Sequence, residues 1–260
     1  MTAEPVRHQR SEGSIHLSMG PMGIVRLREA HAAKVRVPFG SSEAILINTG
    51  GGLAGGDRFS FDITAEEKTG LTVTSQAAER VYRSLGPAAE VAVNLTARDG
   101  ATLLWLPQET ILFDGASLSR RITAELAGSA RFLAVEPVIL GREAMGETVQ
   151  DAQLTDRWRI RQGGKLIFAD DLAFGGTPPA TAATLGEARA FATVVLVAED
   201  AEALLDPTRN AIGARGAASA WSGKLVARLA ARDGFDLRKS LIPALTVLAG
   251  RRSLPKTWTF

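Results

Sequence analysis

The sequence predicts a mainly β protein of multi-stranded stacked or sandwiched sheets, with a few helices that lie mostly near the C-terminus. From about residue 35 to residue 198, short apolar and β-branched segments alternate with glycine-rich turns, a spacing typical of sandwiched antiparallel sheets. After residue 199 the apolar residues instead recur at helical spacing. No internal repeat or low-complexity linker interrupts the chain, so we expect residues 1–260 to form a single domain.

The expected strands are of two kinds. In residues 58–63, Phe59, Phe61 and Ile63 alternate with polar residues, the period of a strand with one buried face. Residues 101–106 and 132–135 are continuous apolar runs, which fit strands covered on both faces, although a buried helix gives the same pattern. The expected strands comprise residues 44–48, 58–63, 71–75, 91–95, 101–106, 120–126, 132–135, 158–161, 165–170 and 191–197.

Two helices are expected in the C-terminal part. Residues 199–211 have the composition of a short helix. In the second segment Pro243 predicts either a kink or a late start, and Gly250 is placed to end the helix. One stripe of this second helix is formed by Leu237, Leu241, Leu245 and Leu248.

Composition excludes several classes of protein. The chain has 260 residues, no cysteine and a net charge of +2, so disulfides, thiol nucleophiles and cysteine-ligated metal centres are excluded. Residues 1–40 and 200–260 carry an excess of Lys and Arg, whereas residues 41–199 are acidic. The basic residues form no aromatic-rich stripe, which argues against nucleic-acid binding. No apolar run approaches the roughly 18 residues of a membrane span, and the polar start of the chain predicts a cytoplasmic protein.

A glycine-rich loop resembles a dinucleotide-binding fingerprint. Gly50, Gly52 and Gly55 match the G-x-G-x-x-G spacing directly after an apolar run. In dinucleotide-binding folds the third glycine opens a helix, whose N-terminus binds the pyrophosphate. Here the loop leads into the alternating strand pattern of residues 58–63. The arrangement is therefore strand, loop, strand, and the glycines are expected to serve backbone shape rather than phosphate binding.

The residues offer little for catalysis. The three histidines, His8, His16 and His31, all precede residue 32, and we expect them to be surface or strand residues because no orienting partner is evident. Glu109 and Asp114 flank an apolar Ile-Leu-Phe, which leaves a carboxylate-dependent hydrolase as the alternative function. Residues 140–147 form a polar segment bracketed by glycines, for which an ordinary surface turn with ion pairs is the simpler interpretation.

Five segments together resemble one family, the urease accessory protein UreD family, also called UreH. They are residues 50–58 (GGGLAGGDR), 78–84 (AERVYRS), 105–116 (WLPQETILFDGA), 140–147 (LGREAMGE) and 252–258 (RSLPKTW). They occur in the order expected for the family and span nearly the whole chain. The chain departs from the family at Asn48-Thr49, where many members have Pro-Pro, and this change could loosen the entry into the glycine loop.

The resemblance implies a non-enzymatic protein of mainly β fold. It also implies a scaffold that binds apo-urease and recruits UreF. UreF in turn engages the GTPase UreG, so that nickel reaches the urease active site. A GTPase role for UreG agrees with the lack of a P-loop in this chain. The expected partners are therefore UreF, UreG and the apo-urease subunits, with no nucleic acid and no membrane.

The resemblance also nominates site residues. Nickel(II) held tightly usually has imidazole or thiolate ligands, which this chain lacks after residue 31, so we expect no tightly bound cofactor and at most nickel in transit. Glu109, Asp114 and Glu147 lie in family-matching segments and are the candidate lining of a transient nickel path. The candidate partner-binding or structural residues are Gly55, Gly56, Asp57, Arg58, Tyr82, Arg83 and Arg142.

Overall fold

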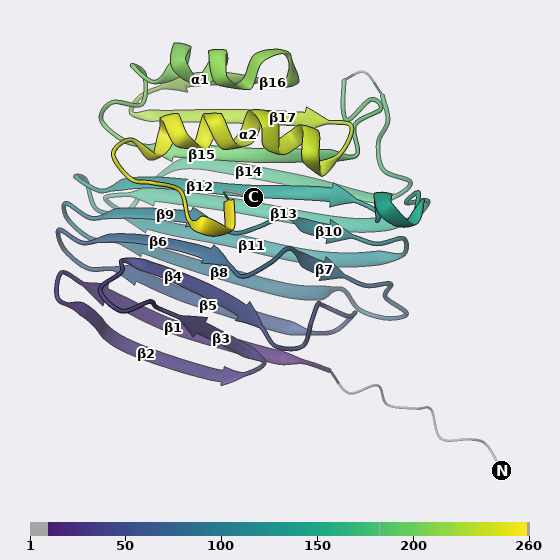
Figure 1. The fold of residues 1–260 in the computed structure, drawn as a ribbon, viewed down its shortest axis with the longest axis horizontal. Coiled ribbons are helices and arrows are strands. Elements are labelled where there is room, and N and C mark those ends of the chain that lie inside the picture. Colours follow the sequence, from purple (N-terminus) through teal and green to yellow (C-terminus); the bar gives the residue numbers. More distant parts are fainter. Residues whose placement is uncertain (1–9, 182, 259–260) are drawn as a thin grey trace.

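Two stacked β-sheets make up most of the molecule, with helices near the C-terminus (Figure 1). The computed structural model describes residues 10–181 and 183–258. The prediction of a mainly β fold with stacked sheets and C-terminal helices is confirmed. The seven-stranded sheet has the order β14-β13-β11-β8-β5-β1-β2, with β1 Glu12–Gly20, β2 Gly23–His31, β5 Arg58–Ala65, β8 Ala89–Ala97, β11 Ala116–Leu126, β13 Ala152–Gln162 and β14 Lys165–Gly176.

The second sheet is ten-stranded, and its main path has the order β16-β17-β15-β12-β9-β6-β4-β3. Two short strands lie off this path, since β10 pairs with both β12 and β7. The strands are β3 Ala33–Arg36, β4 Glu43–Asn48, β6 Gly70–Ser75, β7 Glu79–Val81, β9 Thr102–Leu106, β10 Thr110–Leu112, β12 Arg131–Leu140, β15 Ala190–Val197, β16 Gly216–Trp221 and β17 Lys224–Ala231.

The expectation of antiparallel sheets is wrong for the centre of the molecule. β1, β5, β8, β11 and β13 pair in parallel, as do β4, β6, β9 and β12. The chain passes from a strand of one sheet to a strand of the other through the turns 66–69, 98–101 and 127–130. We call one strand of each sheet with its connecting turn a circuit, and each circuit lies beside the previous one. The strand in the opposite sheet thus provides the crossover that parallel pairing requires. Among the described strands, the antiparallel pairs flank these parallel ones: β1–β2 and β13–β14 in the first sheet, and β3–β4, β12–β15, β15–β17 and β16–β17 in the second.

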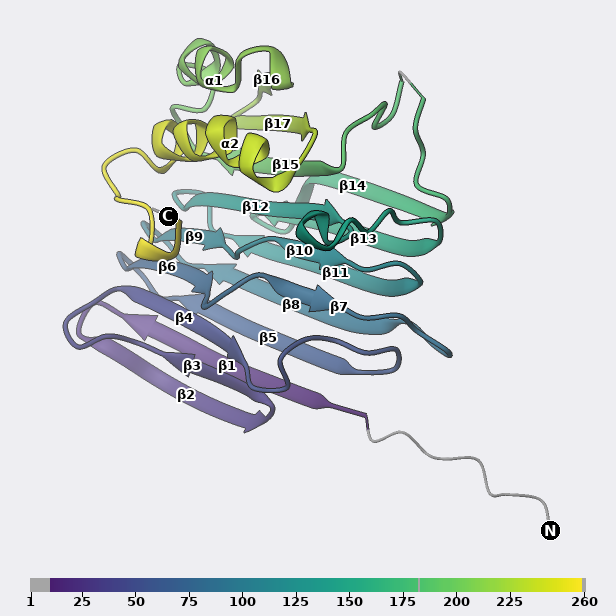
Figure 2. The same ribbon diagram turned by 45° about the vertical axis from the view of Figure 1, so that its right-hand side comes forward.

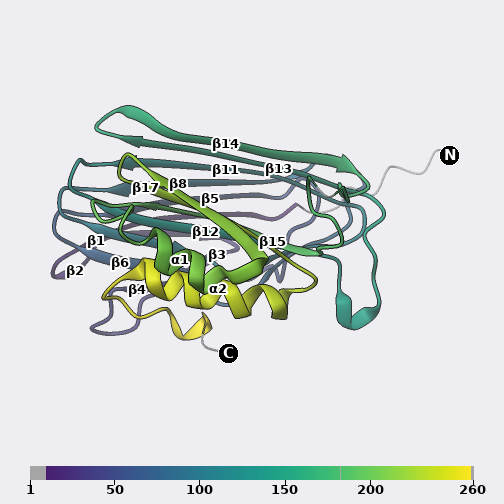
Figure 3. The same cartoon turned by 90° about the horizontal axis from the view of Figure 1, so that it is seen from above.

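The main core lies between the sheets and includes Ile15, Leu17, Ile63, Leu103 and Phe132. A second core lies on the outer side of the ten-stranded sheet, where α2 (Gly234–Ala249) packs against β15 and β17. Figure 3 shows α1 (Leu205–Ile212) and α2 on one side of the molecule and β14 on the opposite side. β9 and β12 are therefore covered on both faces, which confirms the interpretation of their continuous apolar runs.

The helices differ in extent from the expectation. α1 begins at Leu205, because the preceding residues form turns, and ends at Ile212. α2 begins at Gly234, where the Asp233 side chain accepts a hydrogen bond from the Asp236 N–H at 2.7 Å. The alternative that this helix starts late, because of Pro243, is therefore wrong. The helix continues through Pro243 and is capped by Gly250, which has φ 66°. No helix of the described residues is long and apolar enough to cross a membrane.

Candidate functional site

Four of the five recognised sequence segments meet at one end of the sandwich, which we call the rim and define by Tyr82, Arg83, Phe113, Asp114, Arg142 and Glu147. In Figure 1 this end lies on the right, where β7, β10 and the short helix η1 (Glu143–Met145) gather. Backbone hydrogen bonds connect the segments: Phe113 N–H donates to Val81 at 3.1 Å, and Ser84 N–H donates to Gly115 at 2.8 Å. Gly141 N–H donates to Leu112 at 2.8 Å.

Two of the nominated carboxylates lie together in the rim. Asp114 forms an ion pair with Arg83 and accepts N–H groups from Gln150 at 2.8 Å and Asp151 at 3.1 Å. These backbone hydrogen bonds, with the Arg83 charge, hold the pKa of the Asp114 carboxyl below its usual range. Glu147 accepts two hydrogen bonds from the Arg142 guanidinium, at 2.9 and 3.0 Å.

Glu147 also links these segments. Its carboxylate accepts the backbone N–H of Arg142 at 2.9 Å and that of Asp114 at 3.3 Å. The Arg142 hydrogen bonds lower the pKa of the Glu147 carboxyl. Both rim carboxylates are thus ionised at neutral pH. Each accepts several charge-assisted hydrogen bonds, and these bonds fix the geometry of the loops.

Aromatic contacts join this network to the glycine loop. The Tyr82 and Phe113 rings meet edge to face with centroids 5.2 Å apart, and the Arg142 guanidinium lies 4.3 Å from the Phe113 ring centroid. The Tyr82 hydroxyl donates to the Gly51 carbonyl at 2.9 Å. The rim is therefore a surface whose side chains are oriented by one another.

The glycine loop lies between β4 and β5, which confirms the strand, loop, strand prediction. Asp57 is buried and accepts the N–H groups of Ser11 and Ala54, each at 2.8 Å, which closes the turn before β5. A Cβ on Gly55 would lie 1.9 Å from the Ser84 hydroxyl oxygen and 2.7 Å from the Pro87 carbonyl oxygen. Gly56 has φ +85°, a conformation that favours glycine. These glycines serve shape and close packing within the chain.

Replacing Gly55 by alanine is expected to lower the free energy of unfolding by about 1–3 kcal/mol, because the new methyl group overlaps a backbone carbonyl. Urea denaturation of the wild type and variant measures the change. Gly128→Ala is the matched control, since no heavy atom lies within 4 Å of its added Cβ and its φ is not positive. Equal losses in the two variants would contradict the packing argument.

Of the remaining nominated residues, Arg58 lies at the start of β5, where its guanidinium is exposed and pairs with Glu90 at 3.5 Å. Glu109 precedes the short strand β10 and is buried. The Arg238 guanidinium of α2 donates to both of its carboxylate oxygens, at 2.6 and 2.9 Å. Glu109 and Asp114 are therefore bonded to different partners, and the structure does not pair them across a shared site. Of the histidines, His16 lies on β1 and His31 on β2, as expected, while His8 lies outside the described residues.

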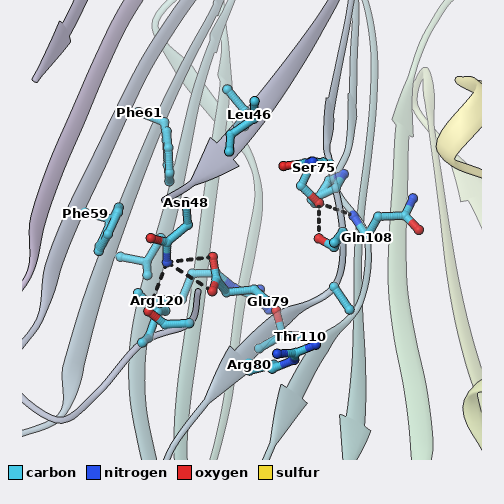
Figure 4. Close-up of a pocket in the computed structure, with 18 of the residues that line it drawn as sticks. Leu46, Asn48, Phe59, Phe61, Ser75, Glu79, Arg80, Gln108, Thr110 and Arg120 are labelled. Carbon is cyan, nitrogen blue, oxygen red and sulfur yellow. Dashed lines mark hydrogen bonds between the residues drawn. The ribbon is translucent and has the colours of Figure 1, made fainter. Parts of the chain in front are cut away.

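A cavity of about 280 Å³ lies between the sheets (Figure 4), and residues 51–53 of the glycine loop form part of its lining. Phe59, Phe61 and Leu46 form part of its apolar wall. Its polar wall includes Glu79, to which the Asn48 side-chain amide donates at 3.2 and 3.3 Å. The wall is therefore apolar on one side and carries an ionisable carboxyl on the other.

Asn48 holds the loop in place instead of loosening it. Its amide also donates to the Gly52 carbonyl at 3.0 Å, while its side-chain oxygen accepts the Gly50 N–H at 2.9 Å. The expectation that Asn48-Thr49 loosens the entry is therefore wrong. The side-chain oxygen of Gln108, a further cavity residue, accepts a hydrogen bond from the Arg238 guanidinium, and its buried Nε2 has no hydrogen-bond partner among the described residues.

A buried charged cluster joins the two sheets beside this cavity. Arg120 of β11 donates to the Asp156 carboxylate of β13 at 2.5 and 3.2 Å and also pairs with Glu136 of β12. Glu136 accepts the Trp105 indole N–H at 2.8 Å, and the Thr110 hydroxyl accepts from Arg120 at 3.1 Å. Burial, opposed by the Arg120 charge, raises the pKa of Glu136 to about 7.

Sequence reasoning missed Glu79, Arg120 and Glu136. A usable signal existed for Glu136, because it interrupts the otherwise apolar run of residues 132–140, and a charge inside a fully covered strand requires a buried partner. Arg120 and Glu79 fall in segments that resemble half-exposed strands, where charged residues are ordinary. Nothing in the local pattern distinguishes them.

Stability is expected to fall as the pH rises through the titration of Glu79. Burial raises the pKa of Glu79 from 4.5 to about 7. Between these values the folded protein keeps a proton that the unfolded chain releases, so the free energy of unfolding decreases from about pH 4.5 to 7. Glu79→Gln should reduce this slope in urea titrations from pH 5 to 8, whereas Ser75→Ala, in the same cavity, should retain it. An unchanged slope in Glu79→Gln contradicts the expectation.

The charged side chains of the rim and of the buried cluster are bonded to one another. Within residues 10–181 and 183–258, no group of three or more His, Cys, Asp or Glu side chains is placed to hold a metal ion. The carboxylates of the rim and of the buried cluster are engaged by arginines. The arrangement orients loops and ties the sheets together.

Comparison with known proteins identifies the family of the chain. The sequence profile of a family described as UreD urease accessory protein matches residues 11–259. The urease accessory protein UreD of Rhizobium etli is 48% identical over 99% of this chain and 98% of its own length. Those of Rhizobium leguminosarum bv. viciae and Agrobacterium fabrum are 46% and 44% identical, each over 98% of this chain and over 98% and 93% of their own lengths. The chain belongs to the UreD family of urease accessory proteins.

Proposed function

We propose that this protein is a non-catalytic scaffold that binds apo-urease and UreF in the cytoplasm, so that UreG joins through UreF and nickel is inserted into urease. The observation that carries the proposal is the rim. Segments far apart in the sequence, each of which matches the family, meet there and are fixed by ion pairs, ring contacts and backbone hydrogen bonds. A surface ordered in advance binds a partner with a smaller loss of conformational entropy.

The composition of the rim suits protein binding. Tyr82, Arg83 and Arg142 are aromatic or arginine residues, the types enriched in the energetic centres of interfaces. Leu85 and Met145, close to them in sequence, expose 90% and 73% of their surface. The rim therefore offers apolar contacts together with charged groups that are already paired and oriented.

The experiment is co-expression with UreF and the urease subunits, followed by affinity capture and urease assay. We expect capture of both partners, and urease activity only when this protein is present. In Arg142→Ala the Glu147 and Phe113 contacts are lost, and capture of at least one partner should fall about tenfold. Trp221→Ala, away from the rim, is the control. Full urease activation without this protein overturns the proposal.

Nickel in transit past Glu109, Asp114 and Glu147 is a further part of the proposal. Carboxylate oxygens are weak, labile ligands for nickel compared with imidazole or thiolate. Each of the three is also balanced by an arginine, namely Arg238, Arg83 and Arg142, so a passing cation competes with a guanidinium and is held briefly. Asp114 and Glu147 share one network, whereas Glu109 belongs to a separate position beside α2.

The test replaces each of the three carboxylates by alanine and measures the nickel content of co-expressed urease. We expect a lower nickel content for at least one variant. Glu125→Ala is the control, because this exposed carboxylate pairs with Arg161 on the outer face of the seven-stranded sheet. Fully metallated urease in all three variants would remove these residues from the path and leave the scaffold proposal intact.

We do not favour the carboxylate hydrolase. Glu109 and Asp114 are bonded to separate arginines, and the lowered pKa of Asp114 makes it a poor general acid at neutral pH.

A further inference from the structure

β2 is one of the two edge strands of the seven-stranded sheet in the described strand order. It pairs with β1 on one side, and it is the last strand in the order of the described residues, at the bottom of Figure 1. Such an edge presents unpaired backbone N–H and C=O groups to which another strand can add. Exposed large apolar residues are also concentrated here, since Ile24 and Leu27 expose 46% and 42% of their surface and Val25 67%.

The two faces of β2 have different chemistry. Leu27 pairs with the buried Leu17 of β1, and residues paired across neighbouring strands point to the same face, so Leu27 lies at the open end of the core between the sheets. Arg26 and Arg28 pair with Ser18 and His16 and therefore face outward. The register shifts near Val25, so the regular part of the edge available for pairing is residues 26–31.

No carboxylate is paired with the two outward arginines among the described residues. Neither Arg26 nor Arg28 forms an ion pair or side-chain hydrogen bond there, and the neighbouring Asp62 pairs with His16 at 3.2 Å. A strand added to this edge would place its outward side chains directly opposite the two guanidinium groups. Carboxylates at alternate positions would be stabilising there and cations destabilising.

A second copy of the chain fits this edge poorly. Antiparallel pairing of two β2 strands around Leu27 places Arg26 opposite Arg28 of the other copy, and pairing around either arginine places it opposite itself. Like charges directly opposite each other across a strand pair are unfavourable. The charge pattern therefore selects a different partner.

We propose that β2 is a docking edge for an extended segment of a partner protein in which acidic residues alternate with apolar ones. The carboxylates face Arg26 and Arg28, the apolar side chains extend the core beyond Leu27, and the backbone adds a strand to the sheet. This interaction belongs to the opposite end of the sheets from β14 and β16, and it does not depend on the urease-related function proposed above.

The test measures binding of short capped peptides to the isolated full chain by fluorescence anisotropy. We expect a peptide of alternating Glu and Val to bind about tenfold more tightly than one of alternating Lys and Val. Opposite Arg26 and Arg28, the two cross-strand charge pairs are attractive with Glu and repulsive with Lys. The acidic peptide carrying N-methyl groups on alternate residues should not bind, since it cannot complete the backbone ladder. Hydrogen exchange should show new protection in residues 26–31 with the acidic peptide.

Charge reversal gives the decisive comparison. In Arg26→Glu/Arg28→Glu the preference should invert towards the Lys-containing peptide. Arg121→Glu/Arg157→Glu is the matched control. These exposed arginines occupy opposite register positions on β11 and β13, two inner strands of the same sheet, so their reversal should leave the preference unchanged. Retained acidic preference after reversal, equal binding of the N-methylated peptide, or self-association of the chain through β2 in sedimentation would each overturn the proposal.

Discussion

Arg120→Met is expected to lower the free energy of unfolding by about 3–5 kcal/mol, the cost typical of removing one partner from a buried ion pair. Arg120 is the only cation that the described contacts give to the buried carboxylates of Glu136 and Asp156. Without it these groups face each other inside the core, where an uncompensated charge is strongly destabilising. The loss is expected to be greater at alkaline pH, where Glu136, whose pKa burial raises to about 7, is ionised.

Urea denaturation with circular dichroism measures this change, and Arg121→Met is the matched control. Arg121 is the next residue of the same strand, but it is exposed on the outer face, so its replacement should change stability by less than about 0.5 kcal/mol. Replacing Arg120, Glu136 and Asp156 together by apolar residues should restore much of the lost stability. A small loss in Arg120→Met alone would show that the cluster is hydrated and not part of a dry core.

Trp258→Ala is expected to cost about 3–5 kcal/mol, the range found for buried aromatic residues. Trp258 belongs to η3 (Lys256–Trp258), the short yellow coil near the C-terminus in Figure 2. Its side chain is fully buried in the second core, which also contains the apolar residues of α2. Its indole N–H donates to the Leu106 carbonyl at 2.9 Å, and the Arg238 guanidinium lies 5.4 Å from its ring centroid. The substitution removes the ring and leaves a cavity beneath α2.

Trp221→Ala provides the control for Trp258, because the Trp221 side chain is 45% exposed and its ring is contacted by Lys224. We expect a loss below about 1 kcal/mol for this variant by the same denaturation measurement. Similar losses at the two positions would mean that the C-terminal segment does not contribute to the core.

Ten strand positions between residues 44 and 197 could be predicted from the sequence, but their pairing could not. The N-terminal strands β1, β2 and β3, the short strands β7 and β10, and β16 and β17, which lie where only helices were expected, were missed. The alternation in residues 58–63 and the apolar run of residues 132–135 correctly identified β5 and β12. The short turn 66–69 has the length of a hairpin connection, which favours antiparallel neighbours. In the structure the same turn connects strands of opposite sheets, and a local pattern does not distinguish these two uses of a short turn.

The candidate site was predictable only in part. The family-matching segments identified Tyr82, Arg142 and Glu147, and the structure brings these three into one network. The ion pair between Glu109 and Arg238 was not predictable, because it joins residues more than 100 positions apart through α2. Likewise the raised pKa of Glu79 was not predictable, because it results from burial by several strands that are distant in the sequence.

The parallel circuits of the chain have a consequence for its synthesis. Arg58 pairs with Glu90 and Glu90 with Ser119, so each new strand finds its neighbour about 30 residues back, a modest separation for a β protein. The circuits can form in order as the chain leaves the ribosome. The apolar outer face of β12 and β15, however, is covered by α2 and Trp258, which are made after both strands. Until then that face is exposed, so a chain whose synthesis stops before α2 is expected to aggregate.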